Sequence, residues 1–70
     1  MLKLGKYRHY KGKDYEVIGV AKLEETLEDM VVYRPLYKTE YDLLVRPLRV
    51  FTENVEINGK TVPRFEYIGE

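Results

Sequence analysis

Two apolar runs separated by a short polar segment predict a β-hairpin in the middle of the chain. The runs cover residues 30–37 and 43–51, and each contains the tripeptide Arg-Pro-Leu. β-Branched and aromatic residues dominate the first run, which favours a buried strand over a helix. The polar segment between the runs has the length of a hairpin loop. We expect this hairpin to be central to a small β-domain and to bury five side chains: Val32, Tyr33, Leu36, Val45 and Phe51.

Alternating positions in the first third of the chain predict a second hairpin. Its strands cover residues 6–11 and 15–21, with a turn at Gly12 between them. Apolar residues occupy both faces of the second strand, which is typical of a central or sharply curved strand, and Gly19 marks a bend in it. Residues 22–29 are acidic and exposed in this interpretation, either as one helical turn or as a loop with one turn.

The last third of the chain predicts one helical turn and a third hairpin. Pro47 suits the first position of a helix, and the apolar spacing that follows predicts a single 3₁₀ turn near residues 47–54. Asn58-Gly59 is the strongest hairpin signal in the sequence. Pro63 cannot donate a ladder hydrogen bond, so the returning arm is an edge strand or is bulged there.

These elements together predict a mainly β fold. We expect a small SH3-like barrel or roll of five to six antiparallel strands, with the helical turn closing one end. Seventy residues are enough for one domain, which we assign to residues 1–70.

Composition narrows the classes of partner and site. Twelve basic and twelve acidic side chains give a formal net charge of zero, which argues against a general nucleic-acid binder. The sequence contains no cysteine, so it has no disulfide and no thiolate metal site. No apolar run approaches the roughly 18 residues that a membrane-spanning helix needs. We expect a cytoplasmic protein without cofactor or metal.

Several segments resemble one known family. They are residues 5–12 (Gly-Lys-Tyr-Arg-His-Tyr-Lys-Gly), residues 26–37, Val45-Arg46-Pro47 with Phe51, Gly59-Lys60, and Val62-Pro63-Arg64-Phe65. Together they are similar to the family called domain of unknown function 1653. The resemblance implies a small β-domain of SH3-like roll type, found mostly in bacteria, with no established activity. The chain departs from the family pattern at Leu23, where a histidine is expected, and at Leu44, where a tryptophan is expected.

Arginine and tyrosine are the candidate binding residues. Guanidinium groups stack on aromatic rings and hold carboxylate or phosphate with two hydrogen bonds. One interpretation is a groove for an acidic peptide, a nucleotide or single-stranded nucleic acid, and the other is that the arginines pair with glutamates and brace a small core. Arg46 and Arg64 lie on different strands, so this hypothesis needs a closed sheet to bring them together. The candidate residues are Arg46, Arg64, Tyr7, Tyr10, Tyr37 and Tyr67.

The sequence therefore favours an interaction module over an enzyme. His9 is the only histidine, and a strand histidine among tyrosines is more often structural than catalytic. No catalytic residue and no nucleophile–base set is predicted. The first hypothesis is a protein- or peptide-interaction module, the alternative is a nucleic-acid or nucleotide-binding accessory domain, and a small enzyme comes third. Salt separates the first two, because phosphate-driven binding weakens steeply with salt.

Overall fold

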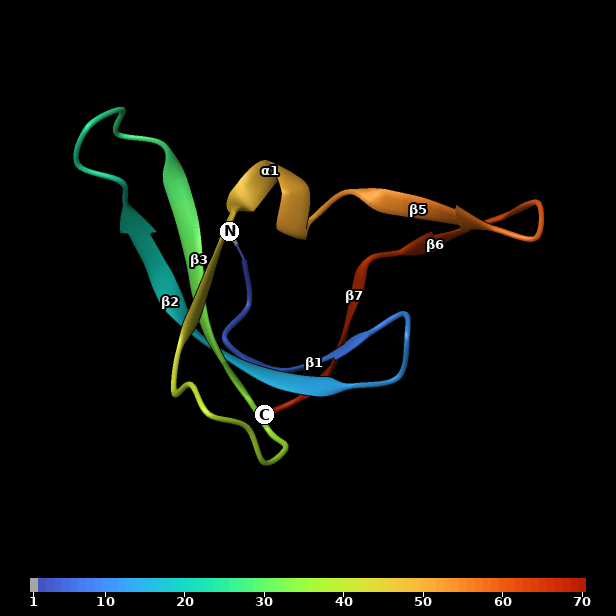
Figure 1. Cartoon of the computed structure of the whole chain (residues 1–70). Helices are drawn as coiled ribbons and strands as arrows, with labels where there is room; N and C mark the ends of the chain where they lie inside the picture. The colour runs from blue at the N-terminus through green and yellow to red at the C-terminus, as the bar shows by residue number, and fades with distance from the viewer. Residues whose placement is uncertain (1) are drawn as a thin grey trace.

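The computed structural model describes residues 2–70, which form seven strands and one short helix (Figure 1). The elements are β1 (Gly5–His9), β2 (Asp14–Lys22), β3 (Asp29–Pro35), β4 (Leu44–Pro47), α1 (Leu48–Phe51), β5 (Asn54–Ile57), β6 (Lys60–Pro63) and β7 (Phe65–Gly69). The prediction of a mainly β fold is confirmed. No helix within the described residues is long and apolar enough to cross a membrane.

A five-stranded antiparallel sheet forms the body of the molecule. Its strand order is β4-β3-β2-β1-β7, so β2 is central, as its two apolar faces predicted. Of the two predicted forms, barrel or roll, a closed barrel is not present: within residues 2–70 no strand pairing joins the edge strands β4 and β7. The chain leaves the sheet after β4 to form α1 and a separate two-stranded sheet, β5–β6, before it returns as β7.

The hairpin predicted between residues 30 and 51 is confirmed as β3–β4, in which Val32 lies opposite Val45. It is not central, however, because β4 is an edge strand. Tyr33 and Phe51 are buried as predicted, and Val32 is half-buried. The predicted burial of Leu36 and Val45 is wrong, since their exposed fractions are 43% and 61%. Val45 lies opposite Val32 on the face of the sheet away from the buried Val31, and Leu36 comes after the end of β3.

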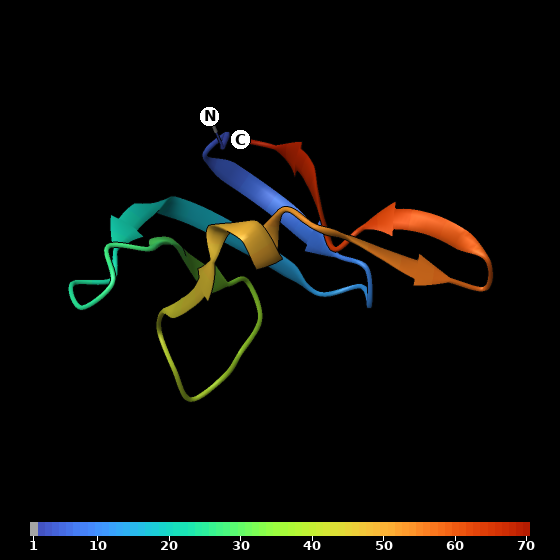
Figure 2. The same cartoon turned by 90° about the horizontal axis from the view of Figure 1, so that it is seen from above.

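The bend predicted at Gly19 is confirmed. The register between β2 and β3 shifts between Val17 and Gly19, so that Val20 then lies opposite the fully buried Val31. An extra residue in one strand bends that strand and increases its twist. The bulge therefore contributes to the curvature of the sheet around α1, which is visible in Figure 2.

The acidic segment between β2 and β3 was predicted to be either one helical turn or a loop with one turn, and the structure shows the loop with one turn. The N–H of Leu27 donates to the carbonyl of Leu23 at 2.6 Å, and Leu27 has a positive φ of 59°. Both leucines are exposed.

The helical turn predicted near residues 47–54 is present but is α-helical. The N–H of Thr52 donates to the carbonyl of Leu48 at 3.0 Å, which is an i to i+4 bond, so the 3₁₀ prediction is wrong for this turn. Pro47 precedes it as the N-cap residue. The turn packs against β3 and β4 and delivers Phe51, which is 1% exposed, into the core.

The Asn58-Gly59 hairpin is confirmed, because both residues have positive φ, as a type I′ turn requires. Its strands β5 and β6 project away from the body (Figures 1 and 2). The break predicted near Pro63 is also confirmed at Arg64, whose N–H donates to the Glu53 carbonyl at 3.1 Å. The last arm is therefore two strands, which is why the chain has seven strands and not five or six.

The core is small and largely aromatic. Its buried members are Tyr7, Val17, Val31, Tyr33, Phe51 and Phe65. The rings of Phe51 and Phe65 stack at 4.0 Å between centroids with an interplanar angle of 5°. The core therefore depends on a contact between α1 and the edge strand β7.

Candidate functional site

One face of the five-stranded sheet is lined with aromatic rings, and we call it the aromatic face. It carries Tyr7, His9, Tyr15, Tyr33 and Phe65. Strand alternation places these side chains on one side, because directly opposed residues in antiparallel strands share a face. Ring centroids are 5.4 Å apart for Tyr15 and Tyr33, 5.7 Å for Tyr15 and Phe65, and 4.8 Å for His9 and Phe65.

The opposite face, which we call the charged face, carries cross-strand ion pairs. Arg8 lies opposite Asp14, and Glu16 lies opposite Arg34. The nitrogen–oxygen distances are 2.8 Å and 3.1 Å, respectively. The arginines on this face therefore find their counterions within the sheet.

Arg46 lies on the aromatic face, opposite the buried Val31. Its Nε donates to the hydroxyl of Tyr33 at 3.3 Å, and its Cζ lies 5.6 Å from the centroid of the Phe65 ring. Strand β4 thus brings a guanidinium group to a ring that belongs to β7 at the other edge of the sheet. This contact forms although no strand pairing between β4 and β7 closes the sheet within residues 2–70.

Arg64 reaches the same region from the junction of β6 and β7. Its Nη2 donates to Oε1 of Glu53 at 2.9 Å, and its Nε is buried without a hydrogen-bond partner within residues 2–70. Burial and the charges of Arg46, Arg64 and Lys11 lower the pKa of His9 below its usual value of 6.5. Both predicted arginines are therefore close enough to His9 to act on it electrostatically.

His9 is held by its neighbours as a neutral ring. Its Nδ1 accepts a hydrogen bond from the N–H of Lys11 at 3.1 Å, and its ring packs on those of Tyr10 and Phe65. No group of three potential metal ligands is found within the described part of the chain. The local contacts agree with the structural interpretation of this histidine.

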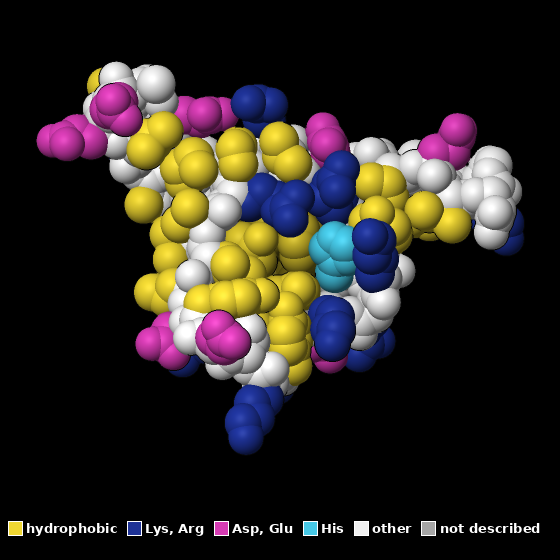
Figure 3. Space-filling model, viewed as in Figure 1, with side chains coloured by type: hydrophobic (Ala, Val, Ile, Leu, Met, Phe, Trp, Pro, Cys, Tyr) yellow, Lys and Arg dark blue, Asp and Glu magenta, His cyan; other side chains and the backbone are white. Residues whose placement is uncertain are grey.

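Figure 3 shows this side of the molecule. The histidine, coloured cyan, lies among Lys and Arg side chains and next to a broad hydrophobic surface, while most acidic side chains lie toward the margins. Lys11 and Lys13 add charge here, with their Nζ atoms 5.9 Å and 4.5 Å from the ring centroids of Tyr10 and Tyr37. The site combines flat apolar rings with an excess of positive charge.

The four candidate tyrosines divide into two pairs. Tyr7 is only 6% exposed and its hydroxyl donates to the Lys3 carbonyl at 2.7 Å, so it offers a ligand almost no surface. Tyr67 packs edge-on against Tyr7. Tyr10 is exposed beside His9, and the hydroxyl of Tyr37 shares a hydrogen bond of 2.9 Å with that of Tyr15. Only Tyr10 and Tyr37 lie where they can extend the aromatic face.

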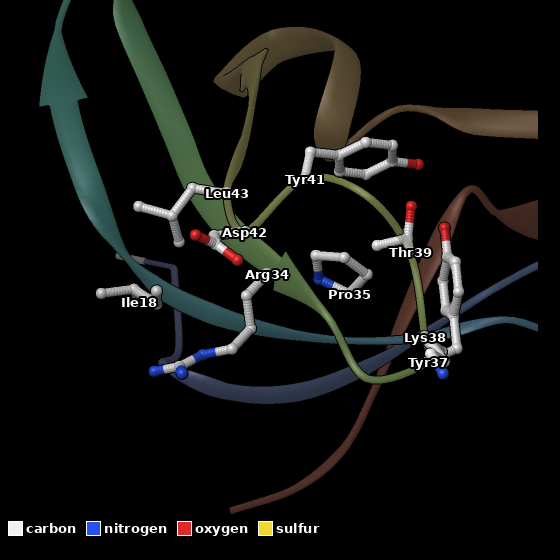
Figure 4. Close-up of a pocket in the computed structure, with 9 residues that line it drawn as sticks. All are labelled: Ile18, Arg34, Pro35, Tyr37, Lys38, Thr39, Tyr41, Asp42 and Leu43. Atoms are coloured by element: carbon white, nitrogen blue, oxygen red, sulfur yellow. The ribbon is translucent and has the colours of Figure 1, made fainter.

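A separate hollow of about 550 Å³ lies beside the loop that joins β3 and β4 (Figure 4). Its lining residues are Ile18, Arg34, Pro35, Tyr37, Lys38, Thr39, Tyr41, Asp42 and Leu43. In Figure 4 the rings of Tyr37 and Tyr41 extend away from Ile18 and Arg34. The guanidinium of Arg34 is already paired with Glu16, so this hollow offers less for recognition than the aromatic face.

Sequence reasoning missed Tyr15, Tyr33 and Phe65 as parts of the site. Period-two alternation could have placed Tyr15 and Tyr33 on the face of their strands that also carries Val17 and Val31. No local signal places Phe65 under Arg46, because that contact depends on how far the sheet curves.

Comparisons with known proteins agree on one family. A family model described as "Protein of unknown function (DUF1653)" matches residues 5–67, which confirms the resemblance seen in the sequence. A crystal structure of a protein belonging to the same family from Bordetella bronchiseptica is 40% identical, with a TM-score of 0.91, and the match covers 97% of this chain and 88% of that chain. No curated protein matches the chain.

Proposed function

We propose that this chain, which belongs to the DUF1653 family of proteins of unknown function, is a protein-interaction module that binds an acidic peptide segment on its aromatic face. The observation that carries the proposal is the position of Arg46 beside a set of rings that includes partly exposed ones. The partly exposed rings are those of His9, Tyr10, Tyr15 and Tyr37. Arginine, tyrosine and tryptophan dominate the binding energy of protein interfaces. Tyrosine lines such surfaces well because it joins an apolar ring to a polar tip.

The fold supports the same function. We propose that the curled antiparallel sheet with a short helix after β4 is an open variant of the SH3-like roll. SH3-type domains dock extended peptides in grooves lined by aromatic side chains. Fold alone does not assign a function, so the proposal rests on the residues of the aromatic face.

A nucleic-acid or nucleotide ligand is the second candidate. It is favoured by cations next to rings, since bases stack on aromatic side chains while basic groups follow the phosphates. It is opposed by the charge count, because twelve acidic side chains balance the twelve basic ones and Glu53 already pairs with Arg64. A peptide with one or two carboxylates matches this modest excess of charge better than a polyanion.

We propose binding and not catalysis for His9. The sequence contains neither serine nor cysteine, the commonest side-chain nucleophiles that histidine activates. Burial and the surrounding cations also lower the pKa of the imidazole, and its Nδ1 accepts a hydrogen bond from the backbone of the turn. These features suit a ring that packs against a ligand.

The test is selection of binders from a displayed library of random peptides. We expect enrichment of peptides that contain aspartate or glutamate. Tyr10 lies next to the aromatic face, and Tyr10→Ser is expected to lower the affinity for the selected peptides about tenfold, or by about 1.4 kcal/mol. Tyr41→Ser is the matched control, because Tyr41 is also exposed but lines the hollow beside the β3–β4 loop.

Two outcomes would contradict the proposal. One is a failure to enrich any peptide, and the other is an equal loss of affinity in the Tyr10 and Tyr41 variants. Binding of a single-stranded oligonucleotide that is tighter than peptide binding and falls steeply with salt would support the second candidate instead.

A further inference from the structure

Arg46 differs from every other arginine in the described chain. Four of the five arginines are paired with a carboxylate: Arg8 with Asp14, Arg34 with Glu16, Arg49 with Glu28, and Arg64 with Glu53. Within residues 2–70, Arg46 has no ion pair, although it is half-buried. Removing a charge from water is unfavourable unless a partner compensates it. The position of Arg46 is therefore one that an external anion would stabilise.

The guanidinium of Arg46 is oriented before any ligand arrives. Its Nε is fixed by the Tyr33 hydroxyl at 3.3 Å, and its plane lies near the Phe65 ring at 5.6 Å. Within the described chain, Nε is the only atom of this group that makes a hydrogen bond, so both terminal nitrogens remain as donors. A fork of parallel N–H groups matches the two oxygens of one carboxylate.

The charges around Arg46 indicate how much negative charge the site accepts. Glu53 compensates Arg64, which leaves Arg46 as the one half-buried arginine without a counterion. His9 is neutral in this environment and adds no charge near neutral pH. One carboxylate restores neutrality, whereas a phosphate dianion would leave one negative charge in excess.

The rings beside Arg46 indicate what should flank that carboxylate. Phe65 and Tyr33 lie directly against the guanidinium, and Tyr15 continues the aromatic face toward Tyr37. Phe65 and Tyr33 are themselves buried, so Tyr15 and Tyr37, which are half-buried, are the rings that can contact apolar side chains one or two positions away on an extended peptide.

We propose that Arg46 is the binding point for one glutamate or aspartate side chain of the bound segment, with the apolar neighbours of that residue packed on Tyr15 and Tyr37. This inference rests on the proposed peptide-binding function and names the chemistry of the ligand. Arg64 and Lys11 strengthen the local positive potential, while Tyr33 positions the guanidinium through its hydroxyl.

The test uses three blocked pentapeptides that differ only at the centre. They are Ala-Leu-Glu-Leu-Ala, its glutamine counterpart and its phosphoserine counterpart, each acetylated and amidated. Binding is followed by NMR through the ring signals of His9, which report on this site alone because the sequence has no other histidine. We expect the glutamate peptide to bind at least about tenfold more tightly than the glutamine peptide.

Variants of Arg46 and Arg34 test whether the preference for the glutamate peptide depends on Arg46. Arg46→Met keeps the apolar stem and removes the charge, and it should abolish the preference for glutamate. Arg46→Lys keeps the charge but loses the fork and should retain only part of that preference. Arg34→Met is the matched control, since it removes an arginine from the charged face and should leave the preference unchanged.

The inference is overturned if the glutamate and glutamine peptides bind equally, or if Arg46→Met keeps the preference. Tighter binding of the phosphoserine peptide would show that Arg46 prefers a phosphate to a carboxylate. The comparison of the three peptides on the unaltered protein remains decisive even if a variant fails to fold. Display-selected acidic peptides that bind the unaltered protein and the Arg46→Met variant equally tightly, but lose affinity in the Tyr10→Ser variant, would leave the proposed function standing while refuting the role of Arg46.

Discussion

The arginines on the two faces of the five-stranded sheet differ in their exposure and in their partners. On the charged face, Arg8 and Arg34 are exposed and each faces a carboxylate on the neighbouring strand. On the aromatic face, Arg46 is half-buried against Tyr33 and Phe65 and has a neutral hydrogen-bond partner.

This difference separates arginines that are paired at the surface from the one that we propose binds a ligand. Exposed ion pairs contribute little to stability, about 0–1 kcal/mol each, so the charged face can be altered with small effect. A half-buried guanidinium without a counterion loses hydration and gains no Coulomb attraction in return. In the proposed function, the aromatic face is therefore where stability is lowered in favour of recognition.

The largest expected effect comes from removing the support of the aromatic face. Phe51→Ala should destabilise the fold by roughly 3–5 kcal/mol, because the lost ring stacks on Phe65 and leaves a cavity. Val45→Ala, on the opposite face and 61% exposed, should change stability by less than about 0.5 kcal/mol. Urea denaturation followed by circular dichroism measures both. A cooperative Phe51→Ala protein of nearly normal stability would show that the two faces do not share one core.

A smaller loss is expected where β1 meets β7. Gly5 has φ of 133°, and a Cβ atom there would lie 2.7 Å from the Gly69 carbonyl oxygen and 3.2 Å from the Tyr67 ring. Gly5→Ala should therefore cost about 1–3 kcal/mol through backbone strain and displacement of β7, which carries Phe65. Gly19→Ala is the control, because a Cβ there meets nothing within 4 Å and its φ is not positive. Equal melting temperatures for the two variants would contradict this explanation.

The pH response of His9 is a more selective test of the aromatic face. Burial, followed by the charges of Arg46, Arg64 and Lys11, lowers its pKa in the folded state below 6.5. The unfolded chain then binds the proton more readily, so this contribution to stability is complete above about pH 6.5 and is lost as the pH falls through the folded-state pKa.

Removing one of those charges should reverse part of that shift. Arg46→Met is expected to raise the pKa of His9 toward its usual value, whereas Arg34→Met on the charged face should leave the pKa unchanged. NMR titration of the His9 ring measures both variants directly. An unchanged pKa in the Arg46 variant would mean that its guanidinium does not act on the imidazole.

The smallest effect is expected on the charged face itself. Arg34→Met breaks an exposed pair with Glu16, and both side chains are more than two-fifths exposed, at 52% and 42%. We expect a loss of less than about 1 kcal/mol, reduced further at high salt. A larger loss in thermal denaturation would mean that the charged face also stabilises the sheet.

Local sequence patterns predicted the elements well but not their neighbours in space. The β3–β4 and β5–β6 hairpins, the bend at Gly19 and the break near Pro63 follow from turn residues and alternation, which act within a few positions. The exposure of Val45 was not predictable, because alternation defines two faces without showing which of them is covered. The lack of a counterion for Arg46 within the described residues was not predictable for a similar reason. Which arginine lacks a counterion depends on the register of all the strands together.

The β5–β6 arm offers a practical use. Its Asn58-Gly59 turn lies at the tip of an arm that projects from the body (Figure 2). Lengthening a loop costs little, about 0.6 kcal/mol for each doubling, so a short insertion at this tip should leave the sheet intact. A fluorophore or affinity tag grafted at this tip would allow the domain to be immobilised, or turned into a sensor for the peptides that we propose it binds.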